Sequence, residues 1–92
     1  MPLTFALQPN PAPAPDARVA EVLANPGFGT FFTDHMAVAQ WTKGQGWHDD
    51  GVRPYGPLSM DPASAVFHYA QEIFEGLKAY RQADGSVWMF RP

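Results

Sequence analysis

The stretch FHYAQEIFEGLKAYR, residues 67–81, combines aromatic, acidic and basic side chains with one glycine and no proline. It begins inside a short predicted helix, because Asp61 offers a hydrogen-bond acceptor just before a proline at a possible first helical position. We expect this helix to continue toward Tyr69 or Gln71. The second half of the stretch, Phe74–Arg81, predicts a β-strand.

A turn signal follows that strand directly. The run Ala83-Asp84-Gly85-Ser86 contains the Asp-Gly pair favoured by a type I′ turn, in which both central residues have a positive φ. The next residues, Val87–Arg91, predict a second strand. Together these elements predict an antiparallel β-hairpin.

Further elements are predicted toward the N-terminus. Asp16 is the expected N-cap of a helix of about two turns, which should stop at Asn25-Pro26-Gly27. Alternating side chains then predict a strand over roughly Asp34–Thr42. Trp47–Gly51 carries a turn signal, and the prolines of Val52–Pro57 favour a sheet edge or an irregular segment over a central strand.

The first fifteen residues, MPLTFALQPNPAPAP, contain five prolines. Each proline fixes φ and removes an N–H group, so neither a helix nor a central strand can run through this part. Residues 1–15 therefore predict a flexible Pro-rich arm, and the elements expected in residues 16–92 predict the α/β (α+β) class.

Composition and charge exclude several functions. The chain of 92 residues is 46% hydrophobic and 16% charged, which indicates a folded protein. Its formal net charge is -3 and its six basic residues are scattered, so binding to nucleic acid or to an anionic membrane is not expected. It contains no cysteine and no apolar run of about 20 residues. A cytoplasmic protein is the expectation.

The chemically active side chains give little local signal. The three histidines have no metal-ligand spacing, and neither a phosphate-binding glycine loop nor a nucleophile elbow is present, so no metal site and no catalytic residue are predicted. Lys43 lies in a glycine-rich turn and Lys78 in a predicted strand, and both are expected to be solvated. On composition the aromatic residues are better explained as a core. The alternative is an apolar cleft, which an aromatic pair such as Tyr69 and Phe74, at a helix-to-strand transition, can line.

Four motifs, in order along residues 27–92, resemble the N-terminal region of the branched-chain amino acid aminotransferases. They are FGTFFTDHM (28–36), Gly46-Trp47, FHYAQEIFEGLKAYR (67–81) and FRP (90–92). This family consists of class IV aminotransferases with the pyridoxal-phosphate fold type IV. The resemblance implies that the chain is an N-terminal fragment, in which residues 16–92 form an incomplete part of the small N-terminal domain of such an enzyme.

The same resemblance implies an activity and a site. The full-length enzyme would transfer the amino group of leucine, isoleucine or valine to 2-oxoglutarate, using pyridoxal 5′-phosphate. Phe28, Tyr69 and Phe74 match the positions that line the substrate pocket. The Schiff-base lysine and the phosphate-binding arginine of the family are expected downstream, so Lys43, Lys78 and Arg91 are not assigned to them. The fragment alone should be inactive and should not bind the cofactor.

A homodimer is the assembly that the resemblance implies. Two alternatives stay open. The chain could come from another fold type IV enzyme, a D-amino acid aminotransferase or an aminodeoxychorismate lyase, or it could be a non-catalytic binding or dimerisation module.

Overall fold

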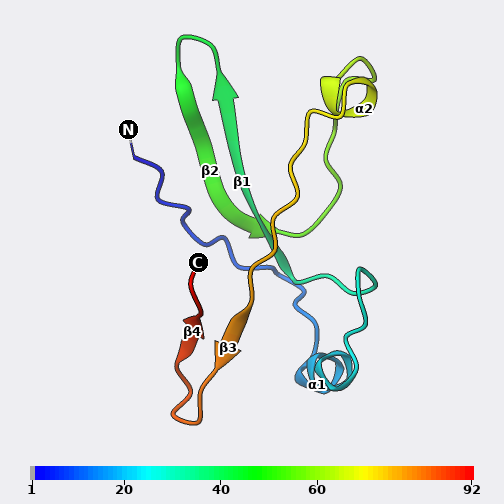
Figure 1. Ribbon diagram of the computed structural model, residues 1–92, viewed down its shortest axis with the longest axis vertical. Helices are drawn as coiled ribbons and strands as arrows, with labels where there is room; N and C mark the ends of the chain where they lie inside the picture. The colour runs from blue at the N-terminus through cyan, green and yellow to red at the C-terminus, as the bar shows by residue number, and fades with distance from the viewer. Residues whose placement is uncertain (1) are drawn as a thin grey trace. The chain divides into compact units, whose positions relative to one another are not determined.

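The computed structural model describes residues 2–92 (Figure 1). The chain divides into two compact units, the first ending at Leu58 and the second covering Ser59–Pro92. The first unit contains α1 (Asp16–Ala24), β1 (His35–Thr42) and β2 (Gly46–Pro54), and the second contains α2 (Ala65–His68), β3 (Ala79–Arg81) and β4 (Val87–Met89). Short helices and two antiparallel strand pairs confirm the predicted mixed α/β class.

The helix α1 forms where it was predicted but is capped differently. Pro15, with φ -60° and ψ 150°, is the N-cap residue, and Asp16 is already helical. The Pro15 carbonyl accepts the N–H of Val19 at 3.0 Å. Asp16 therefore acts through its charge in the first turn, where the helix dipole favours an acid, and not as the predicted cap. The helix ends before Asn25, as expected.

The strands β1 and β2 form a long antiparallel hairpin, drawn in green in Figure 1. The turn predicted at Trp47–Gly51 is therefore wrong, because these residues belong to β2. Of the segment predicted as a sheet edge or irregular, Val52–Pro54 ends this strand of a two-stranded sheet, and residues 55–57 lie outside it. The cause is a β-bulge, in which Asp49 and Asp50 together oppose Ala39. Asp49 has a φ of 50°, a left-handed conformation that aspartate tolerates better than most residues. Turn-forming residues in this strand build the bulge.

As predicted, neither a helix nor a named strand lies within residues 2–15, and part of this Pro-rich arm runs along β2. The N–H of Val52 donates to the carbonyl of Ala6 at 3.1 Å, and the N–H of Gln8 donates to the carbonyl of Val52 at 2.8 Å. Leu7 and Val52 form an isolated parallel bridge. Hence β2 has β1 on one edge and the arm on the other. The flexibility expected of residues 1–15 stays a prediction.

In the second unit the predicted elements are present but shorter. The helix α2 covers one turn, and Asp61 accepts the N–H of Ala63 at 2.7 Å, which makes a local turn and not a helix cap. The hairpin of β3 and β4 is confirmed, with Tyr80 opposite Trp88. Its strands have three residues each, so most of the expected strand from Phe74 is extended chain without a partner strand.

The turn of this hairpin differs from the predicted type I′. Of its residues only Gly85 has a positive φ, 85°, while Asp84 does not. The N–H of Gly85 donates to the carbonyl of Gln82 at 3.0 Å, and the N–H of Gln82 donates to the carbonyl of Ser86 at 2.8 Å. This is the pattern of a type I turn followed by a left-handed residue in a bulge. Gly85 is therefore needed for its φ, and Asp84 for its side chain.

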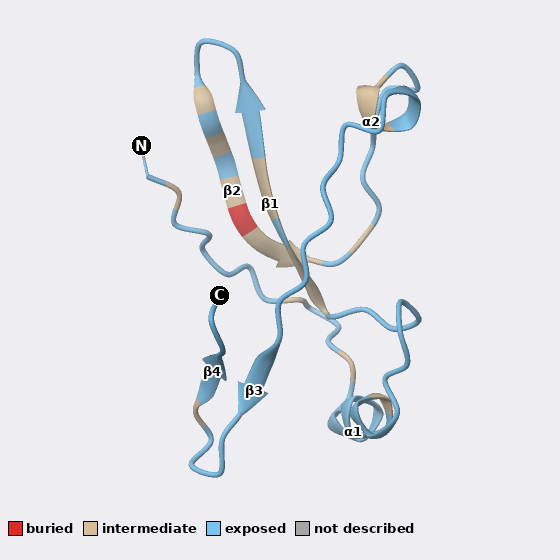
Figure 2. Cartoon of the chain, in the orientation of Figure 1, coloured by how far each residue is buried: buried red, intermediate tan, exposed pale blue. Residues whose placement is uncertain are grey.

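Little of the described chain is buried. Across residues 2–92 Gly51, coloured red on β2 in Figure 2, is the one buried residue, and no hydrophobic side chain is buried. Neither helix of this region is long and apolar enough to cross a membrane. The aromatic side chains predicted as either core or cleft are therefore not a core within this segment.

Candidate functional site

Phe28 lies in the turn that follows α1 and is 92% exposed. Gly27 and Gly29 on either side of it have φ values of 62° and 68°, a conformation that costs glycine little and a larger residue more. The hydroxyl of Thr30 donates to the Phe28 carbonyl at 3.4 Å. The two glycines thus present the Phe28 ring to solvent at the tip of a reversal in the chain.

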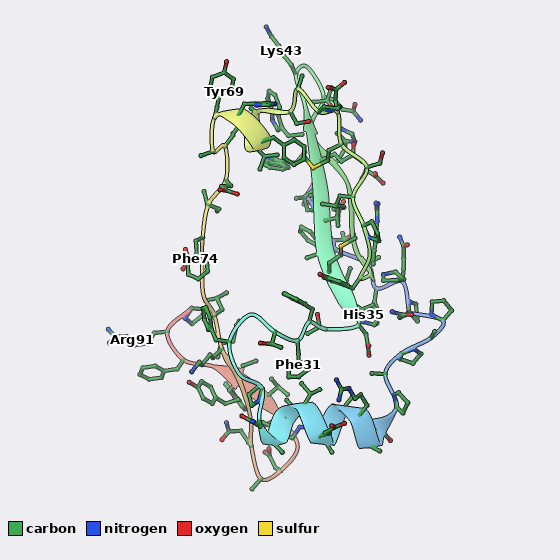
Figure 3. All side chains as sticks on the ribbon, turned by 90° about the vertical axis from the view of Figure 1, so that its right-hand side faces the viewer. Phe31, His35, Lys43, Tyr69, Phe74 and Arg91 are labelled. Atoms are coloured by element: carbon green, nitrogen blue, oxygen red, sulfur yellow. The ribbon has the colours of Figure 1, made fainter. Side chains whose placement is uncertain are left out.

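The residues after Phe28 are fixed at two aromatic contacts. The ring of Phe32 stacks on Tyr55, which follows β2, with centroids 5.6 Å apart and planes 8° apart. The Arg18 guanidinium of α1 lies over the ring of Phe31, 5.3 Å from its centroid, and Figure 3 shows Phe31 next to this helix. Both contacts connect the segment 28–34 to the rest of the first unit.

Tyr69 and Phe74 lie in the second unit. Tyr69 is the C-cap residue of α2, and Phe74 lies on the extended chain that leads to β3, as labelled in Figure 3. They are 83% and 89% exposed. With Phe28 in the first unit, the three predicted substrate residues are divided between the units. Neither unit taken alone therefore contains all three residues.

An open apolar hollow of about 230 Å³ lies beside α1 in the first unit. Val19, Val22 and Leu23 of the helix line it on one side, and Phe32 and Asp34 on the other. None of the three predicted substrate residues lines this hollow. It lies between the helix and residues 32–34, next to the Arg18–Phe31 contact.

Two aspartates hold backbone N–H groups. Asp50 Oδ2 accepts the N–H of Phe5 at 2.6 Å and that of Thr4 at 2.8 Å, and these bonds, Phe5 first, hold the pKa of Asp50 below its usual value. Asp84 Oδ1 accepts the hydroxyl of Ser86 at 2.6 Å and its N–H at 2.9 Å, which lower the pKa of Asp84. Both carboxylates serve the fold by fixing the arm and a turn.

The lysines and histidines form no reactive cluster. Lys43 projects from the tip of the β1–β2 hairpin in Figure 3, and Lys78 is exposed on the chain before β3. Within residues 2–92 no group of three potential metal-binding side chains occurs. His48 pairs with the hydroxyl of Thr42 at 2.9 Å, and His68 with the Pro62 carbonyl at 2.7 Å.

Sequence reasoning missed the contacts of Asn10. Its side-chain N–H donates to the Asp34 carbonyl at 2.9 Å, and its backbone N–H donates to His35 Nε2 at 3.0 Å. The Asp34 carboxylate also accepts the N–H of Ala14 at 3.1 Å. The contacts join positions 20 to 25 residues apart. The only local signal was an asparagine between two prolines, which is common in ordinary turns.

Comparison with known proteins identifies the family. No protein-family model matches the chain. It is 62% identical over 89 residues, 97% of its length, to the "Probable branched-chain-amino-acid aminotransferase" of Streptomyces coelicolor. It is 56% identical over 99% of its length to the branched-chain-amino-acid aminotransferase of Mycolicibacterium smegmatis, and 45% identical over 98% to the mitochondrial one of Saccharomyces cerevisiae.

The matched region is a part of each relative. It covers 25% of the Streptomyces and Mycolicibacterium proteins and 21% of the yeast protein. The chain thus spans about a quarter of the length of the curated relatives it matches. The resemblance inferred from the four motifs is confirmed by identity over nearly the whole chain. The chain belongs to the branched-chain-amino-acid aminotransferase family and corresponds to an N-terminal segment of its members.

Proposed function

We propose that the full-length protein carrying this segment is a pyridoxal-phosphate-dependent transaminase. It transfers the amino group of leucine, isoleucine or valine to 2-oxoglutarate and releases the branched 2-oxo acid and glutamate. The observation that carries the proposal is the 62% identity over 97% of the chain to a protein named for this activity. A cytoplasmic homodimer is part of the same proposal.

In this proposal Phe28, Tyr69 and Phe74 form an apolar wall of the substrate pocket. Their exposure of 83 to 92% in the segment leaves each ring free to contact a substrate or another part of the protein. An apolar wall favours a branched aliphatic side chain by burial, with about 1–3 kcal/mol for each methylene group. It excludes water from the side chain but separates leucine, isoleucine and valine only weakly.

The segment itself does not provide the cofactor site. Pyridoxal phosphate supplies the electron sink for transamination, and a protein holds it through a lysine and through groups that bind its phosphate. Lys43 and Lys78, the two lysines of the segment, are exposed, and nothing in their surroundings desolvates them. Residues outside the segment are therefore expected to hold the cofactor. Residues 16–92 act as an incomplete aminotransferase domain, to which residues 1–15 add an arm.

The test is a transaminase assay on the full-length protein, with leucine or alanine as amino donor and 2-oxoglutarate as acceptor. Leucine should be the better donor. In the Phe74→Ala variant the ratio of kcat/KM for leucine to that for alanine should fall by about 10-fold or more, because a hydrophobic wall is lost. Phe90→Ala is the matched control, since Phe90 is also exposed and lies outside the proposed wall.

The outcomes separate the activity from the site. A full-length protein that does not transaminate leucine would show that the proposed activity is wrong. An active protein in which Phe74→Ala and Phe90→Ala lower the leucine-to-alanine ratio equally would leave the activity intact and refute the role of Phe74.

A further inference from the structure

The arm ends in a set of contacts that its pairing with β2 does not require. We call Asn10, Ala14, Asp34 and His35 the arm clasp. All four residues are half-buried, and three hydrogen bonds of 2.9 to 3.1 Å join the arm pair to the Asp34–His35 pair. The clasp lies where the segment containing Phe28 enters β1.

Asn10 uses its backbone N–H and both polar groups of its side chain in the clasp or next to it. Its side-chain N–H and its backbone N–H donate to Asp34 and His35, respectively. Its Oδ1 accepts the N–H of Ala12 at 2.9 Å, which closes a local turn in the arm. An alanine at this position could keep only the backbone bond. The asparagine side chain is thus the removable part of the clasp.

Asp34 is the point at which distant parts of the first unit meet. Its carbonyl accepts the side-chain N–H of Asn10 at 2.9 Å and the N–H of Tyr55 at 2.9 Å. Its carboxylate accepts the N–H of Ala14, one residue before the N-cap of α1. The ring of Tyr55 in turn stacks on Phe32. The position of Asp34 therefore fixes the C-terminal end of the segment 28–34.

We propose that Asn10 is a positioning residue, which acts through Asp34 to set where the Phe28 segment lies. The segment is anchored by the Arg18–Phe31 contact, the Phe32–Tyr55 stack and the clasp. The clasp contributes hydrogen bonds with defined directions, and these constrain orientation more narrowly than ring contacts do. As a statement about substrate, this inference rests on the proposed role of Phe28.

The test compares three variants of the full-length protein. Asn10→Ala removes both side-chain bonds. Asn10→Asp keeps the acceptor for Ala12 and replaces the N–H donor to Asp34 by an oxygen. Gln8→Ala is the matched control, because Gln8 belongs to the same arm and pairs with β2 through its backbone.

Two readouts are needed. The first is amide hydrogen exchange at Tyr55 and Ala14, whose N–H groups donate to the Asp34 carbonyl and carboxylate; this readout does not depend on activity. Loss of the clasp bond should speed exchange there by about 2- to 10-fold in both Asn10 variants and leave β3 and β4 unchanged. The second is steady-state kinetics, in which KM for leucine should rise about 3- to 10-fold with little change in kcat, because a displaced wall residue weakens binding in the ground and transition states alike.

Local acceleration together with a higher KM, absent from Gln8→Ala, supports the proposal. Unchanged exchange at Tyr55 and Ala14 overturns it. So does acceleration spread equally over the whole protein, which would indicate a general loss of stability, and so does local acceleration with unchanged KM. If the unmodified protein does not use leucine, the proposed function fails, while the exchange result still decides whether Asn10 positions the segment.

Discussion

Replacing Gly51 by alanine tests the packing between the arm and β2. A Cβ atom at this position would lie 3.3 Å from Nε and 3.5 Å from Cγ of Arg53, and 3.5 Å from the side-chain nitrogen of Gln8. Heavy atoms in good contact lie about 3.5–4.0 Å apart, so Arg53 would have to move by a few tenths of an ångström. It is not free to do so, because its guanidinium donates to the Asp49 carboxylate at 2.6 Å and carbonyl at 3.0 Å.

The expected cost follows from these contacts. Overpacking costs about 1–3 kcal/mol. The Arg53 and Asp49 side chains are 27% and 49% exposed, so a weakened ion pair adds at most about 1 kcal/mol. Alanine also lowers the conformational entropy of the unfolded chain, which offsets about 0.4–1 kcal/mol of this cost. We expect Gly51→Ala to destabilise the arm and β2 by about 1 kcal/mol, or about fivefold in the local opening equilibrium.

The assay is amide exchange at Val52 in the full-length protein. Gly56→Ala is the control, because a Cβ there meets no atom within 4 Å and the φ of Gly56 lies outside the left-handed region. In an Arg53→Ala background the obstacle is gone, so Gly51→Ala should no longer speed exchange. Equal exchange at Val52 in Gly51→Ala and Gly56→Ala would refute close packing at Gly51, and so would an effect of Gly51→Ala that persists without the Arg53 side chain.

Other predictions concern the aspartates and the aromatic stack. Because the pKa of Asp50 is lowered in the folded state, its contribution to arm docking is present above about pH 3.8 and is lost as the pH falls through the folded pKa. Exchange of the N–H groups of Thr4 and Phe5 should therefore accelerate in acid. Asp50→Asn should remove that pH dependence. Ser86→Ala should raise the pKa of Asp84 toward its usual value, because the hydrogen bond from the Ser86 hydroxyl is the main cause of the lowered pKa. NMR titration of the carboxylate measures this change. Tyr55→Leu removes the stack on Phe32 and should lower the stability of the first unit by about 0.5–1.5 kcal/mol. The NMR signals of the Phe32 ring should broaden.

Local patterns predicted the elements whose signals lie close together in the sequence. Asp16 and the stop signal at Asn25-Pro26-Gly27 predicted the extent of α1, and the alternation after Asp34 predicted β1. The second hairpin was identified from its Asp-Gly pair, although the turn type was wrong. There Asp84 accepts two hydrogen bonds from Ser86, and Gly85 alone takes the positive φ.

The remaining features depend on contacts between distant residues. The strand β2 was hidden because Asp49, Asp50 and Gly51 are turn formers that here build a bulge and a close packing position. Docking of the arm depends on Asp50, 45 residues from Phe5, and no short-range pattern reveals this. The site residues came from resemblance and not from spacing, since an aromatic side chain looks the same in a core and in a cleft.

Pairing of the arm with β2 has to wait until β2 has been synthesised. The arm is translated before β2, and Phe5 precedes its acceptor Asp50 by 45 residues. At about 5–20 residues per second, the ribosome takes roughly 2 to 9 s to supply that acceptor. A local hairpin such as β1–β2 closes in about 1–10 μs once its strands exist. The arm is therefore expected to join a hairpin that has already formed, because its acceptor in β2 is made seconds after the arm itself.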